Sequence, residues 1–184
     1  VEIVDPGNTT VFCDKFLSIL RSLPDGEIEF EQQEQNLDIR PMFKKIDFQL
    51  RSIASDKYPE LQDISDDTYF ELPQKDLLEM INQTIFAVSD DETRYYMNGV
   101  FLENVDSKLV MVATDGRRLS YIAKDVDSTI QAFAGVIIPP KVLSLVKRLA
   151  SGEGNISVSV TNKNIFFKFD NKKLVSNLIE GQFP

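Results

Sequence analysis

The 184-residue sequence contains no histidine and a single cysteine, Cys13. Without histidine, the chain lacks the side chain that most often acts as a general acid or base near neutral pH. It also lacks a glycine-rich phosphate loop and a cluster of residues with the spacing of metal ligands. One cysteine cannot build a disulfide framework, which favours a reducing compartment. These absences argue against most enzyme classes, and we expect neither a metal nor another cofactor.

Long apolar runs are absent too. No stretch approaches the roughly 20 apolar residues that span a bilayer, and residues 1–5 lack the basic region and apolar run of a secretory signal. The content of 42% hydrophobic and 27% charged residues is ordinary for a globular domain. We therefore expect a cytoplasmic globular protein with no membrane partner. Because the chain has no initiator methionine, we also expect that it was cut from a longer protein.

Basic residues are in deficit, with 20 lysines and arginines against 29 acidic residues and a net charge of −9. A protein that holds nucleic acid by broad neutralisation of phosphates usually carries an excess of positive charge. The net charge therefore argues against that mode of binding. It leaves room for a local basic patch.

An internal repeat organises the chain. Residues 11–23 align with residues 137–149, and each copy reads as an amphipathic helix followed by a glycine-containing turn and alternating strands. Both copies end in an aromatic residue followed by proline, at positions 58–59 and 183–184. At an offset of 141 − 15 = 126, the aligned pairs are Lys15 with Lys141, Leu17 with Leu143, Ser18 with Ser144 and Arg21 with Lys147.

A third, weaker copy begins at Tyr69. A short strand stopped by Pro73 precedes a helix expected over residues 74–88. Three strands are expected next, over residues 95–104, 108–114 and 118–124, with Asp115-Gly116 as a hairpin turn. The apolar stripe of the helix comprises Leu77, Ile81, Ile85 and Val88. The fold class is then α+β, built from repeated strand–helix–three-strand units with antiparallel sheets.

Two such units complete one domain. We therefore expect a whole domain over residues 68–184 and only half a domain over residues 1–67. The stretch 55–68 between them is polar and acidic and contains Pro59, as expected of a linker.

Small polar and basic side chains recur on one face of the repeated helix. In the helix after Pro140, the stripe of Val142, Val146 and Leu149 should be buried. The opposite face has two interpretations: an ordinary solvated surface, or a surface that slides past phosphates without gripping bases. Its residues are Lys141, Ser144 and Arg148 in this helix, and Lys15, Ser18 and Ser22 in the first copy.

Two segments are more specific, residues 94–100 (Arg-Tyr-Tyr-Met-Asn-Gly-Val) and residues 112–120 (Val-Ala-Thr-Asp-Gly-Arg-Arg-Leu-Ser). They could be an ordinary strand and a tight turn. A turn bearing two arginines beside Met97 and Leu119 would instead form an apolar hollow with a cationic rim. Such a hollow suits a short peptide with apolar anchors and an acidic or amide group.

In order and spacing, these motifs resemble the bacterial beta sliding clamps, the beta subunits of DNA polymerase III. The resemblance also includes Ile-Pro before the helix at 140 and Leu-Ile-Glu-Gly-Gln-Phe-Pro at 178–184, and it is looser over the first third. It implies a DNA-clamp fold, with three domains per chain, joined head to tail in a dimeric ring whose helices line the hole. The chain would hold the second half of the first domain and the whole middle domain.

The resemblance also implies a function. The ring would encircle duplex DNA regardless of sequence and tether the polymerase III catalytic subunit, the clamp loader, other polymerases and repair proteins through short peptides, without catalysis or a cofactor of its own. An acidic exterior would limit non-specific DNA binding. The implied peptide-binding residues are Met97, Thr114, Gly116, Arg117, Arg118, Leu119 and Pro184; the implied DNA-facing residues are Arg94, Tyr95, Tyr96, Lys141, Ser144, Arg148 and Lys15.

Two other function classes stay open. A stand-alone peptide-binding adaptor would keep the turn at 114–119 but would not need a recurring basic helix face. A hydrolase would need paired carboxylates, such as Asp90 with Asp91, or Asp115. Acidic loops of this kind are more often solvated turns or helix ends.

Overall fold

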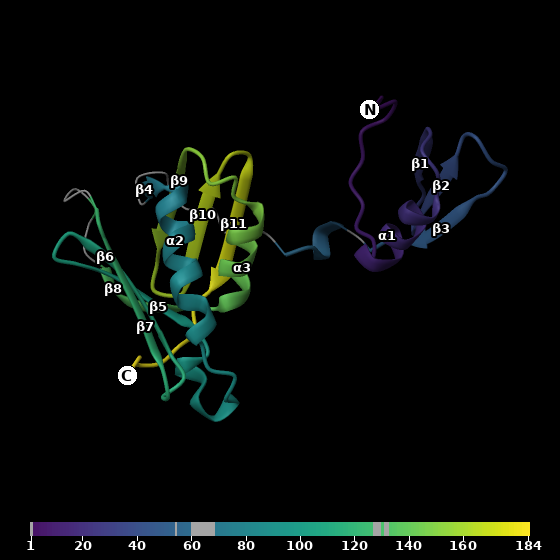
Figure 1. Cartoon of the computed structure of the whole chain (residues 1–184). Helices are drawn as coiled ribbons and strands as arrows, with labels where there is room; N and C mark the ends of the chain where they lie inside the picture. Colours follow the sequence, from purple (N-terminus) through teal and green to yellow (C-terminus); the bar gives the residue numbers. More distant parts are fainter. Residues whose placement is uncertain (1, 54, 60–68, 127–129, 131–132) are drawn as a thin grey trace. The chain divides into compact units, whose positions relative to one another are not determined.

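The computed structural model describes residues 2–53, 55–59, 69–126, 130 and 133–184. The chain divides into two compact units, 1–62 and 63–184, which we describe separately (Figure 1). The domain boundary expected at 67/68 lies outside the described residues. Within the described part of the chain, every helix is too short or too polar to cross a membrane.

The first unit is a helix followed by a three-stranded antiparallel sheet of order β1-β2-β3. A small core of Leu37, Ile39 and Leu50 packs against Phe16 and Ile19 of the helix. None of the described side chains of this helix is itself buried. The elements are α1 (Cys13–Ser22), β1 (Ile28–Gln32), β2 (Asn36–Pro41), β3 (Phe48–Arg51) and the 3-10 turn η1 (Ser55–Lys57).

The second unit contains the strand–helix–three-strand pattern twice, as the sequence predicted. The first copy comprises β4 (Phe70–Pro73), α2 (Gln74–Thr84), the 3-10 turns η3 (Ile85–Ala87) and η4 (Glu92–Met97), β5 (Val100–Val105), β6 (Lys108–Thr114) and β7 (Leu119–Asp125). The second copy comprises β8 (Phe133–Ile138), α3 (Pro140–Leu149), β9 (Asn155–Val160), β10 (Asn164–Phe169) and β11 (Lys172–Asn177).

The two copies exchange their first strands. The sheets have the orders β11-β10-β9-β4 and β7-β6-β5-β8, so that β4 pairs antiparallel with β9 and β8 pairs antiparallel with β5. Each sheet of the second unit therefore depends on a strand from the other copy. Local sequence patterns predict strands but not this exchange, because the pairing joins segments far apart in the chain.

The repeat between α1 and α3 extends to single hydrogen bonds. The amide of Ile53 donates to the carbonyl of Thr10 at 2.8 Å, and the amide of Ile179 donates to the carbonyl of Ile137 at 2.9 Å. Both helices have ten residues. The first unit thus has the architecture of one half of the second.

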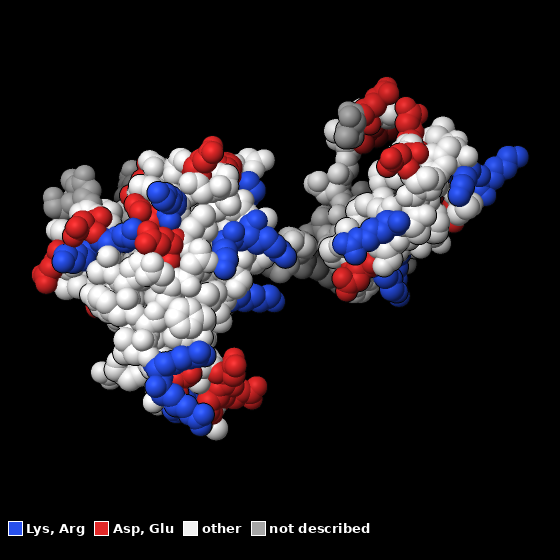
Figure 2. Space-filling view, in the orientation of Figure 1, with Lys and Arg blue, Asp and Glu red and all other residues white. Residues whose placement is uncertain are grey.

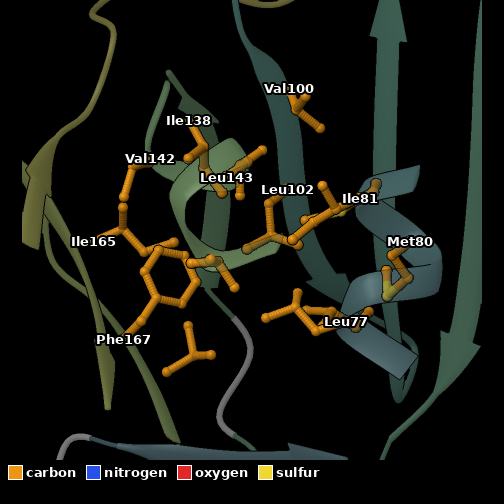
Figure 3. Packing of buried hydrophobic residues seen from close by; sticks show 14 of the residues in the cluster. Leu77, Met80, Ile81, Val100, Leu102, Ile138, Val142, Leu143, Ile165 and Phe167 are labelled. Carbon is orange, nitrogen blue, oxygen red and sulfur yellow. The ribbon is translucent and has the colours of Figure 1, made fainter. Parts of the chain in front are cut away.

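One core joins both helices and both sheets of the second unit. Figure 3 shows side chains from α2, α3, β5 and β10 converging between the layers. Leu77, Ile81, Leu102, Leu143 and Phe167 are all at most 2% exposed. Burial of each such side chain contributes about 1.5–3 kcal/mol. This packing fixes which faces of α2 and α3 stay at the surface.

Two expected elements differ from those observed. The helix expected to continue to Val88 ends at Thr84, whose buried hydroxyl donates to the carbonyl of Met80 at 2.8 Å, and the chain then tightens into η3. The strand expected from Tyr95 begins only at Val100, because residues 92–97 form η4. By contrast, β6 has the predicted bounds and β7 differs by one residue at each end.

Candidate functional site

The turn between β6 and β7 is closed by its own polar groups. The hydroxyl of Thr114 donates to the carbonyl of Arg118 at 2.7 Å and accepts the amide of Gly116 at 3.1 Å. Gly116 has a φ of +83°, which other residues rarely adopt. Thr114 is only 8% exposed, so its hydrogen bonds are well shielded. The predicted hairpin turn is confirmed, and its geometry is fixed locally.

Asp115 caps this turn. Its Oδ1 accepts the amides of Arg117 at 2.9 Å and Arg118 at 3.0 Å, and its Oδ2 accepts Nε of Arg118 at 3.1 Å. The Arg117 amide, followed by the Arg118 amide, holds the pKa of Asp115 below its ordinary value. A general base works best with a pKa near the operating pH. The carboxylate is therefore suited to orienting Arg118 and poorly suited to hydrolysis.

Met97 and Arg94 lie against the same turn. A Cβ atom on Gly116 would stand 2.8 Å from Nη1 of Arg94 and 3.6 Å from Cε of Met97. Met97 is 6% exposed. The structure thus brings together four of the residues implied in peptide binding, Met97, Thr114, Gly116 and Arg118. It also places the guanidinium of Arg94 at this turn; contact of Arg94 with DNA stays a prediction.

Asp91 positions Arg94 from the other side. Its Oδ2 accepts Nε of Arg94 at 2.9 Å, and its Oδ1 accepts the amide and the hydroxyl of Thr93. The Thr93 hydroxyl is the main cause that lowers the pKa of Asp91. Asp91 is therefore the N-terminal cap of η4. Asp91, a candidate catalytic carboxylate of the hydrolase interpretation, therefore has a structural role like that of Asp115.

The remaining implied peptide-binding residues lie around the turn or follow the last strand. Arg117 and Leu119 are exposed, Leu119 at 65%. The ring of Phe183 stacks on Phe101 of β5, with 4.9 Å between centroids and 18° between planes. This stack holds the segment before Pro184 against the sheet that carries the turn. Among the described contacts, none joins Pro184 to the turn itself.

The helix face expected on α3 is confirmed. Lys141, Ser144 and Arg148 are exposed, and the buried side chains of α3 are Val142, Leu143 and Val146. Leu149, expected in the buried stripe, is only half-buried, and Leu143 takes a place in the core. Figure 2 shows basic side chains over α3, whereas basic and acidic side chains lie side by side at the end of the unit that carries the turn.

The other implied DNA-facing residues lie on different elements. Tyr95 and Tyr96 of η4 make an edge-to-face pair with centroids 5.8 Å apart, and Tyr95 is 54% exposed. Lys15 is exposed on α1 in the first unit, where its ammonium lies 5.9 Å from the ring of Phe12. Contact of these three residues with DNA stays a prediction.

Sequence reasoning missed Phe86. Its ring is 57% exposed and lies 5.8 Å from the guanidinium carbon of Arg118. The available signal was its place outside the apolar stripe of the preceding helix, between Ile85 and Ala87. Over the described ranges, no three metal-ligating side chains are grouped.

Comparison with known proteins gives concordant matches. Residues 71–184 match the family model of the DNA polymerase III beta subunit, central domain. A beta sliding clamp from Treponema pallidum is 42% identical over 184 residues, covering 100% of this chain and 50% of the relative. A clamp structure from Bartonella birtlesii bound to griselimycin has a TM-score of 0.90 at 32% identity, covering 100% of this chain and 50% of that one. A clamp structure from Bacillus subtilis has a TM-score of 0.88 at 31% identity, covering 100% and 48%.

The fold is therefore the α+β fold of DNA sliding clamps. The chain belongs to the family of DNA polymerase III beta subunits, the bacterial beta sliding clamps. It spans about half the length of the relatives that it matches. The predicted family resemblance is confirmed over the whole chain.

Proposed function

We propose that the complete protein is a DNA sliding clamp, a non-catalytic processivity factor that encircles duplex DNA in the bacterial cytoplasm. In this proposal the chain supplies the second half of the first domain and the whole middle domain of a head-to-tail dimeric ring. The polymerase III catalytic subunit, the clamp loader, other polymerases and repair proteins bind through short peptides. The family assignment supports the proposal, and the Thr114–Leu119 turn is the observation that carries it.

The turn has the features of a peptide-binding surface. Hydrogen bonds of Thr114 and Asp115 close its backbone, Leu119 offers an exposed apolar side chain, and Arg118 offers a cation oriented by Asp115. Apolar anchors with adjoining arginines are typical of energetically important interface positions. The Bartonella clamp binds griselimycin. We propose that griselimycin and partner peptides compete for this surface.

The exposed face of α3 supports the DNA part of the proposal. Lys141 and Arg148 lie on it with Ser144 between them, in a chain whose net charge is −9. A ring holds DNA by topology, so its hole needs only a mildly positive surface. Contacts to phosphates alone read no sequence, and they leave the ring able to slide.

The decisive experiment loads the complete protein, with its cognate clamp loader, onto circular and onto linear DNA. Retention on the circle and loss after the circle is cut are expected, because only a ring is topologically linked. Equal loss from both would favour a peptide-binding adaptor. Equal and salt-sensitive retention on both DNAs would show ordinary electrostatic binding and would reject the proposal of a ring.

A second experiment tests the peptide site. Arg118→Ala and Met97→Ala should weaken binding of a polymerase-derived peptide about 10-fold or more, the loss typical of interface hot spots. Met97→Leu keeps an apolar side chain of similar volume and serves as the matched control. Wild-type affinity in both alanine variants, with circular dichroism unchanged, would disprove the assignment.

A further inference from the structure

Phe86 is a large aromatic side chain held at the surface. It lies in η3 between Ile85, which packs on the main core, and Ala87, which is 0% exposed. The tight turn therefore points the ring outward, where it is 57% exposed. Single exposed apolar side chains are common in proteins. What distinguishes Phe86 from such side chains is the charged group beside its ring.

That neighbour is the guanidinium of Arg118. Its central carbon lies 5.8 Å from the centroid of the Phe86 ring, within the range of cation–π attraction. Nε of the same guanidinium donates to Oδ2 of Asp115 at 3.1 Å. The ring and the carboxylate thus hold one cation between them. Within the described part of the chain, no bond or ion pair engages the terminal nitrogens of Arg118.

Two hydrogen bonds connect the elements that carry Phe86 and the Thr114–Leu119 turn. The hydroxyl of Ser120 donates to the carbonyl of Gln83, which joins β7 to the end of α2. The amide of Ser89 donates to the carbonyl of Met97 at 3.0 Å. Arg118 immediately precedes β7, and its guanidinium reaches the ring of Phe86 in the 3-10 turn that follows α2. The contact between Phe86 and Arg118 therefore follows from the way the fold joins α2 to β7.

We propose that Phe86 is a positioning residue for Arg118 and that the pair makes the site selective for peptides with a carboxylate beside their apolar anchors. This inference rests on the proposed peptide-binding function. The terminal nitrogens of a fixed guanidinium bind a carboxylate with two parallel hydrogen bonds. The ring on one side and Asp115 on the other restrict the rotation of Arg118. Less rotational freedom is then lost when the carboxylate binds.

The test uses the complete protein and two synthetic peptides. Both carry the same apolar anchor residues, and they differ in one adjacent position, which is aspartate in one and asparagine in the other. Affinities are measured by fluorescence anisotropy for the wild type, Phe86→Leu, Phe86→Tyr, Arg118→Met and the double variant Phe86→Leu/Arg118→Met. Leucine keeps an apolar side chain at position 86 but removes the ring, and tyrosine keeps the ring.

The wild type should prefer the aspartate peptide. Phe86→Leu should reduce that preference about two- to fivefold, the ratio that an exposed cation–π contact provides, while affinity for the asparagine peptide stays within twofold. Phe86→Tyr should restore the preference. The double variant should equal Arg118→Met, because Phe86 acts through Arg118.

Three results would overturn the inference. Equal weakening of both peptides by Phe86→Leu would make Phe86 a plain apolar contact or a structural residue. Additive losses in the double variant would show that Phe86 acts independently of Arg118. Unchanged affinity in Phe86→Leu would show that the ring has no role. Binding of neither peptide by the wild type would instead reject the proposed peptide-binding function, on which the inference depends.

Discussion

Leu17 of α1 and Leu143 of α3 occupy the same position of the repeat, 143 − 17 = 126 residues apart, yet Leu17 is 38% exposed and Leu143 is 0% exposed. Within the second unit, α2 and α3 lie side by side (Figure 1), and the core that both helices share encloses Leu143. In the described part of the first unit, α1 is the only α-helix that packs on the sheet. If residues 1–67 are half a domain, as proposed, a second helix would complete the core at Leu17.

This difference predicts the cost of truncation at the two positions. Leu143→Ala should lower the free energy of unfolding of the chain by about 2–5 kcal/mol, as for other buried leucines. Leu17→Ala in the chain should cost less than about 1 kcal/mol, because a partly exposed side chain loses little burial. Urea denaturation of the two variants and the wild type measures both values.

The same pair tests the proposed domain organisation. If a further half-domain covers α1 in the complete protein, Leu17→Ala should cost about as much there as Leu143→Ala, about 2 kcal/mol or more. Ser18→Ala, which changes an exposed neighbour, is the control. A small cost for Leu17→Ala in the complete protein would contradict the proposal that residues 1–67 are half a domain.

Regular elements of the second unit could be predicted because their patterns are local. Strand β6 followed from apolar residues bounded by the turn at Asp115-Gly116, and α2 and α3 followed from helical spacing. The stretch before Val100 could not, since Tyr95 and Tyr96 favour strands by propensity. The Asp91 cap of η4 overrides that preference. The aspartate two residues before Thr93 was the available signal.

The site shows the same division. The residues of the turn were predicted from a motif whose parts are close in sequence, and Gly116 indeed adopts a positive φ. The contacts of Arg94 with Gly116 and of Phe86 with Arg118 join segments that only the folded sheet brings together. The exchange of β4 and β8 between the sheets is of the same kind. Single-sequence patterns carry no information on such pairings.

The Asp115 cap predicts a response to acid. Its pKa is held below the ordinary 3.8 by the amides of Arg117 and Arg118. A carboxylate with a lowered folded-state pKa stabilises the turn at pH values above 3.8, and that stability is lost as the pH falls through the folded-state pKa. Hydrogen exchange of the two arginine amides, measured by NMR between pH 7 and pH 2 and corrected for intrinsic rates, should show protection that falls below about pH 4.

Asp115→Asn is the matched control for this titration. Its side-chain oxygen can still accept the two amides, but it has no proton to gain in this range. Protection should be lower than in the wild type at neutral pH, and should not change with pH. Acid-dependent protection that persists in Asp115→Asn would assign the effect to another group.

Lys124 joins β7 to α2 through two carboxylates. Its Nζ lies 3.3 Å from Oδ1 of Asp76 and also bonds Oε2 of Glu79, and the bond to Glu79 is the main cause that raises its pKa above 10.5. Because the folded-state pKa is raised, this stabilisation is complete below pH 10.5 and is lost as the pH rises through the folded-state value.

Lys124→Met keeps the aliphatic stem and removes the charge. The variant should unfold at lower urea than the wild type at pH 7, and the difference should shrink in 1 M salt and again above pH 11. Lys147→Met, at an exposed position of α3, serves as the control for general charge effects. A difference that is independent of both salt and pH would show that packing of the stem, and not its charge, joins the two elements.

The hairpin between β5 and β6 offers a stabilising change. Asp106 and Ser107 both have positive φ, 52° and 57°, which is the backbone of a two-residue turn that favours Asn-Gly. Asp106→Asn with Ser107→Gly should raise the free energy of unfolding by about 0.5–1 kcal/mol, because these residues adopt the left-handed region with less strain. The turn lies at the far end of β6 from Thr114, so binding at the site should not change.

Val105→Gly is the matched control, since glycine in a strand should lower stability. Loss of stability in the Asn-Gly variant would show that the hydroxyl or the carboxylate at these positions matters more than the backbone.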